Sequence, residues 1–154
     1  MLAVAGQKTA VYLPGEGAAV APRIGVFDGA ANPVAQYPLS GPIADDAVVS
    51  KFRTDFTIWT GNSLIYLDSA TMTPTWGYPA ALGPGVELAG ALLVPVGGGI
   101  AVLDSRTGQE RSRIAVDRGD VTGPVNLTVL GDTILEQRGD ELVALGPVAA
   151  TGTP

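Results

Sequence analysis

One segment type recurs four times along the chain, and this repeat restricts the possible folds more than any other feature. The four copies read RIGVFD (23–28), SLIYLD (63–68), GIAVLD (99–104) and ELVALG (141–146). Their last residues lie 40, 36 and 42 positions apart. A period of about 40 residues is typical of a propeller blade, which is a small sheet of four strands. The repeat therefore predicts an all-β chain, a β-propeller of about four blades with four antiparallel strands each.

The strand that precedes each segment also belongs to the repeat. Three of the four copies align without a gap over this strand, and Gly61, Gly97 and Gly139 then coincide. Each glycine stands between two strand-like runs, where a tight hairpin needs a residue that tolerates positive φ. We therefore expect a hairpin at each of these glycines.

Hydrophobic patterning separates inner strands from outer ones. The runs LIYL, IAVL and LVAL are apolar at successive positions, so both of their faces should be buried between neighbouring blades. The segments 73–79 and 109–116 are more polar or contain proline, as expected at an outer edge. The pattern predicts fifteen strands and no helix, with the last blade one strand short. The predicted strands are 2–5, 8–13, 22–28, 33–38, 46–50, 54–60, 63–68, 74–78, 86–89, 91–96, 99–104, 110–116, 124–129, 132–137 and 140–145.

We divide the chain into blades at about 1–39, 40–80, 81–118 and 119–146, followed by a tail at 147–154. No stretch reaches the ~20 apolar residues that a membrane-spanning helix needs. The N-terminus lacks a basic region and reads as a strand, so we do not expect a signal peptide there. Propellers have about four to eight blades. Four is the lower end of this range, so each blade would have to turn through a large angle to close a ring. We therefore expect either additional blades from a longer chain or a homodimer of two copies.

Composition excludes several kinds of chemistry. The 154 residues include no Cys and no His, so there is no thiol chemistry and no Ser–His–Asp device. The net charge is −6, and the nine Lys and Arg residues are scattered. Binding to nucleic acid requires clustered cations, so we expect no nucleic-acid partner. We predict no catalytic residue, no metal site and no cofactor.

The block VLDSRTGQERSRIAV (102–116) resembles the PQQ-like, or quinoprotein-type, propeller repeat. That repeat has a strand ending in Leu-Asp, a Thr-Gly turn and a further strand with a docking tryptophan. Leu67-Asp68, Leu103-Asp104 and Thr107-Gly108 match it, and Phe27-Asp28 is similar. Trp76, eight places after Asp68, occupies the tryptophan position, where the other two repeats carry Gln36 and Ser112.

The resemblance has implications for function. Family members that use pyrroloquinoline quinone are long dehydrogenases with a Ca²⁺ site and, typically, a disulfide between adjacent cysteines. This chain has no Cys and about half the number of blades. Other members are non-enzymatic scaffolds, including an envelope lipoprotein of the outer-membrane assembly machinery. The resemblance thus implies a non-catalytic scaffold of the bacterial cell envelope, with any membrane anchor outside this segment.

Several acidic residues are candidate sites. Asp28, Asp68 and Asp104 each begin a turn, and an Asp in that place accepts hydrogen bonds from backbone N–H groups two residues on. We therefore interpret them as turn-forming residues rather than ligands. The Asp45-Asp46 pair is interpreted as a solvated loop, because neighbouring residues on a strand point apart. The same reasoning disfavours a Ser–Lys device at Ser50-Lys51.

Possible partner-binding residues lie in the second and third blades. Four aromatic residues cluster in the second blade, and they form either a partner-binding surface or contacts between blades. They are Trp59, Tyr66, Trp76 and Tyr78. We interpret Trp76 as a packing residue, whereas both interpretations stay open for Trp59. Arg111 and Arg113 are two apart on one strand, so they should share a face, and Arg118 lies nearby. The predicted partner-binding residues are Trp59, Tyr78, Arg111 and Arg113.

The sequence supports two functional hypotheses. The first is a non-catalytic binding or scaffold module with a protein partner, because propellers bind through their loops and central opening. The alternative is a fragment of a propeller enzyme or carbohydrate-binding protein, with carboxylates lining its central channel. Paired carboxylates within about 5–10 Å in a cleft would favour that alternative.

Overall fold

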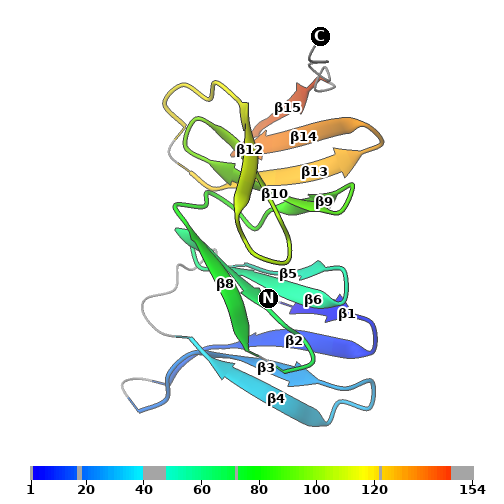
Figure 1. Cartoon of the computed structure of the whole chain (residues 1–154). Coiled ribbons are helices and arrows are strands. Elements are labelled where there is room, and N and C mark those ends of the chain that lie inside the picture. Colours follow the sequence, from blue (N-terminus) through cyan, green and yellow to red (C-terminus); the bar gives the residue numbers. More distant parts are fainter. Residues whose placement is uncertain (1, 17–18, 40–47, 72, 122, 147–154) are drawn as a thin grey trace.

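The computed structural model of the chain describes residues 2–16, 19–39, 48–71, 73–121 and 123–146. Within these ranges it contains fifteen β-strands and no helix (Figure 1). Accordingly, no helix in the described part is long and apolar enough to cross a lipid bilayer. The predicted strands are all present. The fifth, predicted at 46–50, runs from Val48 to Phe52, and residues 46–47 lie outside the described part.

The strands form four antiparallel sheets, each made of consecutive strands. The first sheet consists of β1 (Leu2–Ala5), β2 (Lys8–Leu13), β3 (Arg23–Phe27) and β4 (Pro33–Pro38). The second consists of β5 (Val48–Phe52), β6 (Asp55–Trp59), β7 (Ser63–Leu67) and β8 (Pro74–Pro79). The third consists of β9 (Val86–Leu88), β10 (Ala91–Val96), β11 (Gly99–Leu103) and β12 (Glu110–Ala115). The fourth has three strands in the described part, β13 (Val125–Leu130), β14 (Thr133–Arg138) and β15 (Glu141–Leu145).

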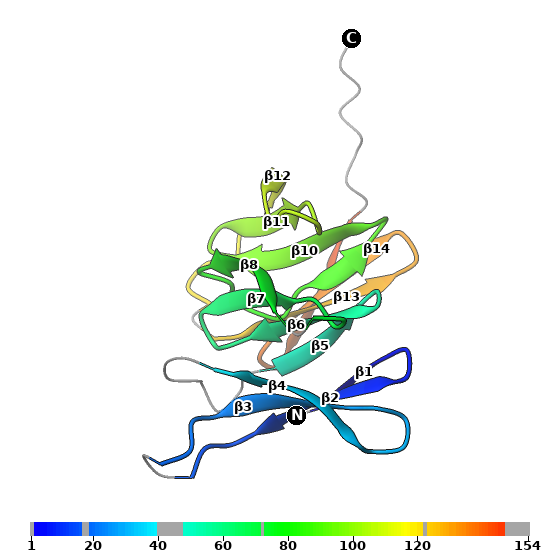
Figure 2. The same cartoon turned by 60° about the horizontal axis from the view of Figure 1, so that its bottom comes forward.

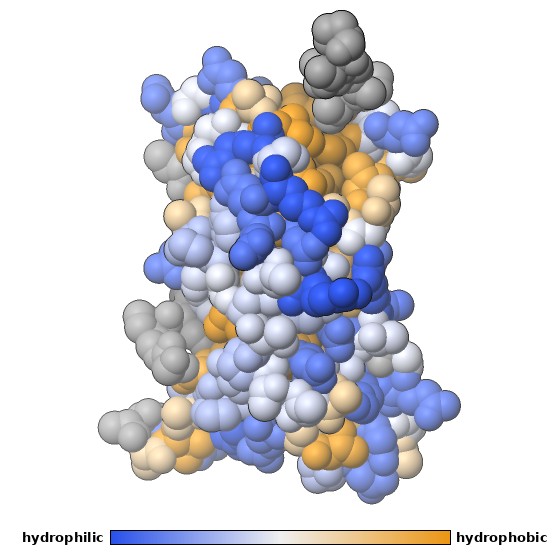
Figure 3. Space-filling model, in the orientation of Figure 1, coloured by the Kyte–Doolittle hydropathy of each residue, from blue (hydrophilic) through white to orange (hydrophobic). Residues whose placement is uncertain are grey.

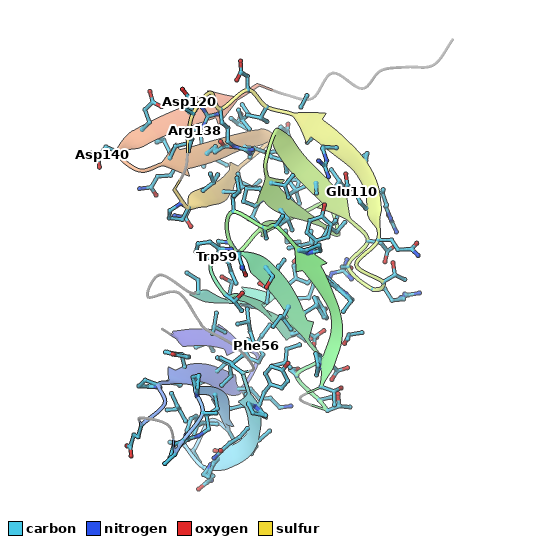
Figure 4. The ribbon with its side chains drawn as sticks, turned by 90° about the vertical axis from the view of Figure 1, so that its left-hand side faces the viewer. Phe56, Trp59, Glu110, Asp120, Arg138 and Asp140 are labelled. Carbon is cyan, nitrogen blue, oxygen red and sulfur yellow. The ribbon has the colours of Figure 1, made fainter. Side chains whose placement is uncertain are left out.

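The sheets follow one another face to face rather than edge to edge. Figures 1 and 2 show the first sheet at one end of the molecule, with the second and third stacked beyond it. In Figure 4 the stack bends into an arc, with β8 and β12 (green and yellow) on its outer side. The first strands of neighbouring sheets are in contact, β1 with β5 and β9 with β13. The sheets are therefore arranged radially, like the blades of a fan.

Hydrophobic side chains fill the space between each pair of neighbouring sheets. On β7, Leu64 and Tyr66 pack toward the third sheet, whereas Leu67 and Ile65 pack toward the first. Leu64 and Leu67 are both fully buried. The prediction that such a strand is buried on both faces is thus confirmed for the inner sheets. Phe56 lies in the contact between the first two sheets (Figure 4).

The last sheet departs from this pattern. Its strand β15 carries LVAL, which was predicted to be buried on both faces, yet Leu142 is 67% exposed and Ala144 is exposed. The equivalent Leu64 of the second sheet is fully buried. The prediction is wrong for this strand because, in the described part of the chain, no sheet packs against its far face.

A one-residue bulge recurs in the first three sheets. The register between the third and fourth strand shifts after Val26, Tyr66 and Val102. Trp76 pairs with Tyr66, and the equivalent partners in the other sheets are Ala35 and Ser112. The prediction of Gln36 as the counterpart of Trp76 is therefore wrong by one position. The turn after Asp28 closes on Asn32, one residue earlier than the corresponding turns of the next two sheets.

The predicted hairpin glycines are confirmed with one change. Gly61 and Gly139 adopt positive φ, at 102° and 57°. In the third sheet the positive φ, at 79°, falls on Gly98 rather than on Gly97. The consecutive glycines at 97–99 let the turn shift by one residue without a steric penalty.

Polar contacts at equivalent places connect the first three sheets. In the second and third sheets, the residue after the turn aspartate is a serine whose carbonyl oxygen accepts a hydrogen bond from the preceding sheet. Trp76 Nε1 donates to Ser105 at 3.0 Å, and Lys8 Nζ donates to Ser69 at 2.5 Å. The indole of Trp76 also packs on Gly108, whose φ is +70°. Trp76 is thus a packing residue, as predicted, and Lys8 supplies a similar connection where the first sheet lacks the tryptophan.

A buried ion pair connects the third and fourth sheets. Glu136 on β14 is fully buried and occupies the position that holds Ile58 and Val94 in the second and third sheets. Arg118 contacts Glu136 through two nitrogens at 2.6 and 2.8 Å and donates to the Val96 carbonyl at 2.5 Å. Burial alone raises the pKa of Glu136, but Arg118 and Arg138 outweigh it and lower that pKa. The carboxylate is therefore ionised inside the core.

We predict that Gly108→Ala destabilises the chain by about 1–3 kcal/mol more than Gly131→Ala. Both glycines have positive φ, so both substitutions introduce backbone strain of about 1–2 kcal/mol. Only at Gly108 would the new methyl group lie 2.5 Å from the Trp76 ring, which adds overpacking. Urea denaturation followed by tryptophan fluorescence measures the difference. Equal losses would show that Trp76 does not pack on this turn.

We predict that Glu136→Gln lowers the free energy of unfolding at neutral pH by about 3–5 kcal/mol, because Arg118 would remain buried without a full counter-charge. The folded pKa of Glu136 lies below its ordinary 4.5. The stabilisation is therefore complete above pH 4.5 and is lost as the pH falls through the lowered pKa. Denaturation at several pH values should show wild type and variant converging in acid. Glu110→Gln, in an exposed ion pair, is the control with a far smaller effect.

Candidate functional site

A polar cleft of about 520 Å³ opens between the second and third sheets. It is formed by the turns after β7 and β11, the outer strands β8 and β12, and the loop before β6. Half of its charged lining is acidic and half is basic. These side chains are Arg53, Asp55, Asp68, Asp104, Arg106 and Arg111. This cleft is the candidate functional site.

The repeat itself places two of the acids in the cleft. Asp68 Oδ1 accepts hydrogen bonds from the N–H groups of Ala70 and Thr71, at 2.7 and 2.8 Å. Asp104 Oδ1 accepts the same two bonds from its own turn, and in the first sheet Asp28 Oδ1 accepts from the N–H groups of Ala30 and Asn32. The prediction that these aspartates form turns is confirmed. Their conserved geometry explains why carboxylates gather on this side of the molecule.

These bonds keep the turn carboxylates ionised. Hydrogen bonds from the N–H groups of Thr71 and Ala70 lower the pKa of Asp68. The Arg111 guanidinium, which forms an ion pair with Asp104, lowers the pKa of that residue to about 2, with help from the N–H groups of its turn. Neither group holds a proton at neutral pH, so neither is a general acid.

Asp55 connects two parts of the cleft wall. Its Oδ2 accepts the hydroxyl of Tyr66 at 2.7 Å, and its Oδ1 accepts the N–H of Ser69 at 2.9 Å. The Tyr66 side chain is mostly buried, and this burial, together with the Asp55 carboxylate, raises the pKa of its phenol. Sequence analysis missed Asp55, because only the register of β6 and β7 brings it to the turn after β7.

Aromatic rings pack against one another next to the cleft, and Tyr66 belongs to its lining. Tyr66 stacks on Trp76 with 5.0 Å between centroids, and Phe52 meets Tyr66 edge to face at 5.7 Å. Arg53, which also forms an ion pair with Glu87, lies over the Phe52 ring at 5.5 Å. Packing of this kind holds the cleft walls rigid.

A second polar cluster lies beside the cleft on the outer strands. The Tyr78 hydroxyl donates to Glu110 at 2.6 Å, and Arg113 forms an ion pair with Glu110 at 2.8 Å. Arg113 and the Tyr78 hydroxyl together lower the pKa of Glu110 to about 2. The cluster connects β8 to β12. Figure 3 shows hydrophilic residues gathered over β12.

The bulge on β12 corrects the prediction for its arginines. Arg111 is the extra residue of the bulge, between the pairs Leu103↔Glu110 and Val102↔Ser112. The bulge interrupts the alternation of faces, so Glu110 and Arg113 meet although they are three positions apart. Arg111 instead turns to Asp104. The two arginines therefore do not act as one pair on a shared face.

Two further predicted residues lie in the interior. Trp59 is 3% exposed, and its Nε1 donates to the Ala81 carbonyl at 2.9 Å, between the second and third sheets (Figure 4). It therefore belongs to the core rather than to a partner-binding surface. Arg118 is 8% exposed and paired with Glu136, so it does not join Arg111 and Arg113. Sequence analysis missed this ion pair, because its partners come from different blades.

The remaining candidates that the structure describes add no second site. Asp45 and Asp46 lie outside the described residues. Ser50 and Lys51 are neighbours on β5, and only Lys51 is exposed. Among the described residues, no group of three or more His, Cys, Asp or Glu side chains is placed to hold a metal ion.

Taken together, the four radial sheets are the blades of a β-propeller. Comparison with known proteins gives the same fold. The crystal structure of BamB from Moraxella catarrhalis matches 93% of this chain with a TM-score of 0.65 and 18% sequence identity. The match spans 46% of that BamB chain. The predicted fold class, an all-β β-propeller, is thus confirmed.

Neither a family model nor a curated protein matches the chain. The likeness to BamB therefore concerns the fold, and the function has to be argued from the surface of this chain.

We predict that Tyr66→Phe destabilises the chain by about 1–2 kcal/mol. The substitution leaves the partly buried Asp55 carboxylate without one of its two hydrogen-bond donors. Tyr78→Phe is a matched control, because it removes an equally short bond to a carboxylate at an exposed position. Thermal unfolding should show the larger fall in Tm for Tyr66→Phe. A larger fall for Tyr78→Phe would contradict the assignment of Asp55 as the connecting residue of the cleft.

Proposed function

We propose that this chain is a non-catalytic binding or scaffold segment of a PQQ-like β-propeller protein in the bacterial cell envelope. The observation that carries the proposal is the match of nearly the whole chain to about half of BamB. The Leu-Asp and Thr-Gly elements and the docking of Trp76 on the next blade support the PQQ-like assignment. A rigid stack of blades presents loops at fixed positions, which suits the recognition of a protein partner.

We assign partner binding to the cleft and the adjoining strand β12. The side chains of Arg111 and Arg113 are 64% and 47% exposed although both are ion-paired. Arg106 on the cleft rim is exposed and forms no ion pair with any described residue. Tyr78 adds an aromatic ring beside them. Arg and Tyr are enriched in protein interfaces, and three exposed guanidinium groups suit an acidic segment of a partner.

The electrostatics of the cleft argue against the enzymatic alternative. Glycosidases need one carboxylic acid with a raised pKa beside one ionised carboxylate. Here the pKa values of Asp68 and Asp104 are both lowered, and each Oδ1 is already occupied by its own turn. These acids also lie between two blades, near their outer strands, rather than in a central channel.

The envelope location and a membrane anchor outside this segment are parts of the same proposal. They rest on the resemblance to the non-enzymatic branch of the family. Cell fractionation of the producing bacterium with a tagged full-length protein tests them directly. Recovery from the envelope fraction is expected, and recovery from the cytoplasm alone would contradict this part of the proposal.

Site-specific photo-crosslinking tests the binding surface in the same cells. A photoreactive amino acid at Arg106 should give a discrete crosslink to a protein partner. The control position is Asn62, exposed in the β6–β7 hairpin at the opposite end of the strands. The double substitution Arg111→Glu and Arg113→Glu should reduce the crosslink several-fold. Equal crosslinking from both positions, or a hydrolytic activity lost in Asp68→Asn, would overturn the proposal.

A further inference from the structure

The exposed large hydrophobic residues of the described chain gather on its two terminal blades. Two are on the first blade and two on the last; they are Val4, Val34, Leu130 and Leu142, each at least 50% exposed. The second and third blades have none among their described residues. Exposed apolar surface that extends beyond single residues marks an interaction site, so the faces of the two terminal blades are the candidates.

The far face of the last blade is one of these surfaces. Strand register places Leu135 beside Thr128 and Ala144, and Gln137 beside Leu142. Ile134 and Glu136 point the other way, toward the third blade. Figure 3 shows hydrophobic residues gathered over β13–β15. The outer edge of β15 has no paired strand among the described residues, so backbone groups are also free there.

The far face of the first blade is the other surface. Ala10, Ile24 and Val26 are fully buried on the side toward the second blade. On the opposite side, Leu13 and Phe27 cover Gly25, where a Cβ would lie 3.0 and 3.1 Å from them. Val11 pairs with Gly25, and Val4 pairs with Thr9 on this same side. The result is an apolar face with no blade against it in the described part.

The repeat shows that these two faces are complementary. Val11 occupies the place of Ile58 and Val94, which face the preceding blade in the two inner sheets. Leu135 occupies the place of Leu93, which faces the following blade. The last blade therefore exposes the kind of face that an inner blade packs against its following neighbour. The first blade exposes the kind of face that an inner blade packs against its preceding neighbour. Figure 4 shows the first and last blades at opposite ends of the arc, with the second and third blades between them.

We propose that two copies of this chain associate head to tail, with the far face of the last blade of each copy packed on the far face of the first blade of the other. The match to 46% of a BamB chain supports this occupant, because two such arcs together have about the extent of one BamB chain. A head-to-tail contact closes into a ring when the rotation of each copy is half a turn. The inference rests on the propeller fold and is independent of the proposed binding role.

Light scattering coupled to size exclusion provides the test on the 154-residue chain. We expect twice the mass of one chain. Leu142→Glu on the last blade and Val4→Lys on the first should each weaken association at least about tenfold, because each variant puts a charge into both contacts. Ser112→Glu, exposed on β12, is the control and should remain dimeric.

Mixing the two variants distinguishes head-to-tail association from a symmetric contact of like faces. In a mixed dimer, one contact carries both introduced charges, which attract, and the other contact carries neither. The mixture should therefore regain the dimer although each variant alone is monomeric. A monomeric unsubstituted chain, dimers in both variants, or no recovery on mixing would each overturn the proposal. Circular dichroism of each variant verifies that the sheets are intact.

Discussion

The burial of apolar sheet faces against one another is the interaction on which this structure depends. No blade is thick enough to form a core alone, so each one becomes stable by covering its neighbour. Leu64 and Tyr66 face one neighbour while Ile65 and Leu67 face the other. A fully buried Leu or Ile contributes about 1.5–3 kcal/mol. Leu64 and Leu67 are both fully buried and face opposite neighbours, so one strand stabilises two contacts at once. This explains why the inner strands do not alternate between apolar and polar residues.

Directional contacts then fix how the faces align. The carbonyls of Ser69 and Ser105 are equivalent in the repeat, and each accepts a donor from the blade before it. The donors differ, an ammonium from β2 in one case and an indole from β8 in the other. The repeat thus keeps the carbonyl acceptor at the same position, whereas the donor comes from a different strand in each blade. The cleft lies beside the indole contact, between the second and third blades.

Sequence reasoning predicted the strands and the turn aspartates because both depend on local patterns that repeat. It placed Trp76 correctly for the same reason. It failed where one residue changes the geometry, since the bulge at Arg111 alters which side chains share a face. It also failed for pairs from different blades, such as Arg118 with Glu136, because no local pattern connects them. Trp59 illustrates a third limit, because a large aromatic residue suits a core and an interface equally well.

The glutamate in the core has a consequence for how the molecule opens. No charged side chain is buried between the first three blades among the described residues, whereas the contact between the third and fourth encloses the Arg118–Glu136 ion pair. When that contact opens, water solvates both charges, which offsets part of the cost of separation. In a linear array, cooperativity between neighbours depends on the strength of each contact. We therefore expect the fourth blade to separate first, so that amide protons of β14 exchange through a partial opening that leaves β6 and β10 protected. In this opening the first three blades would remain packed together while the fourth blade separates from them.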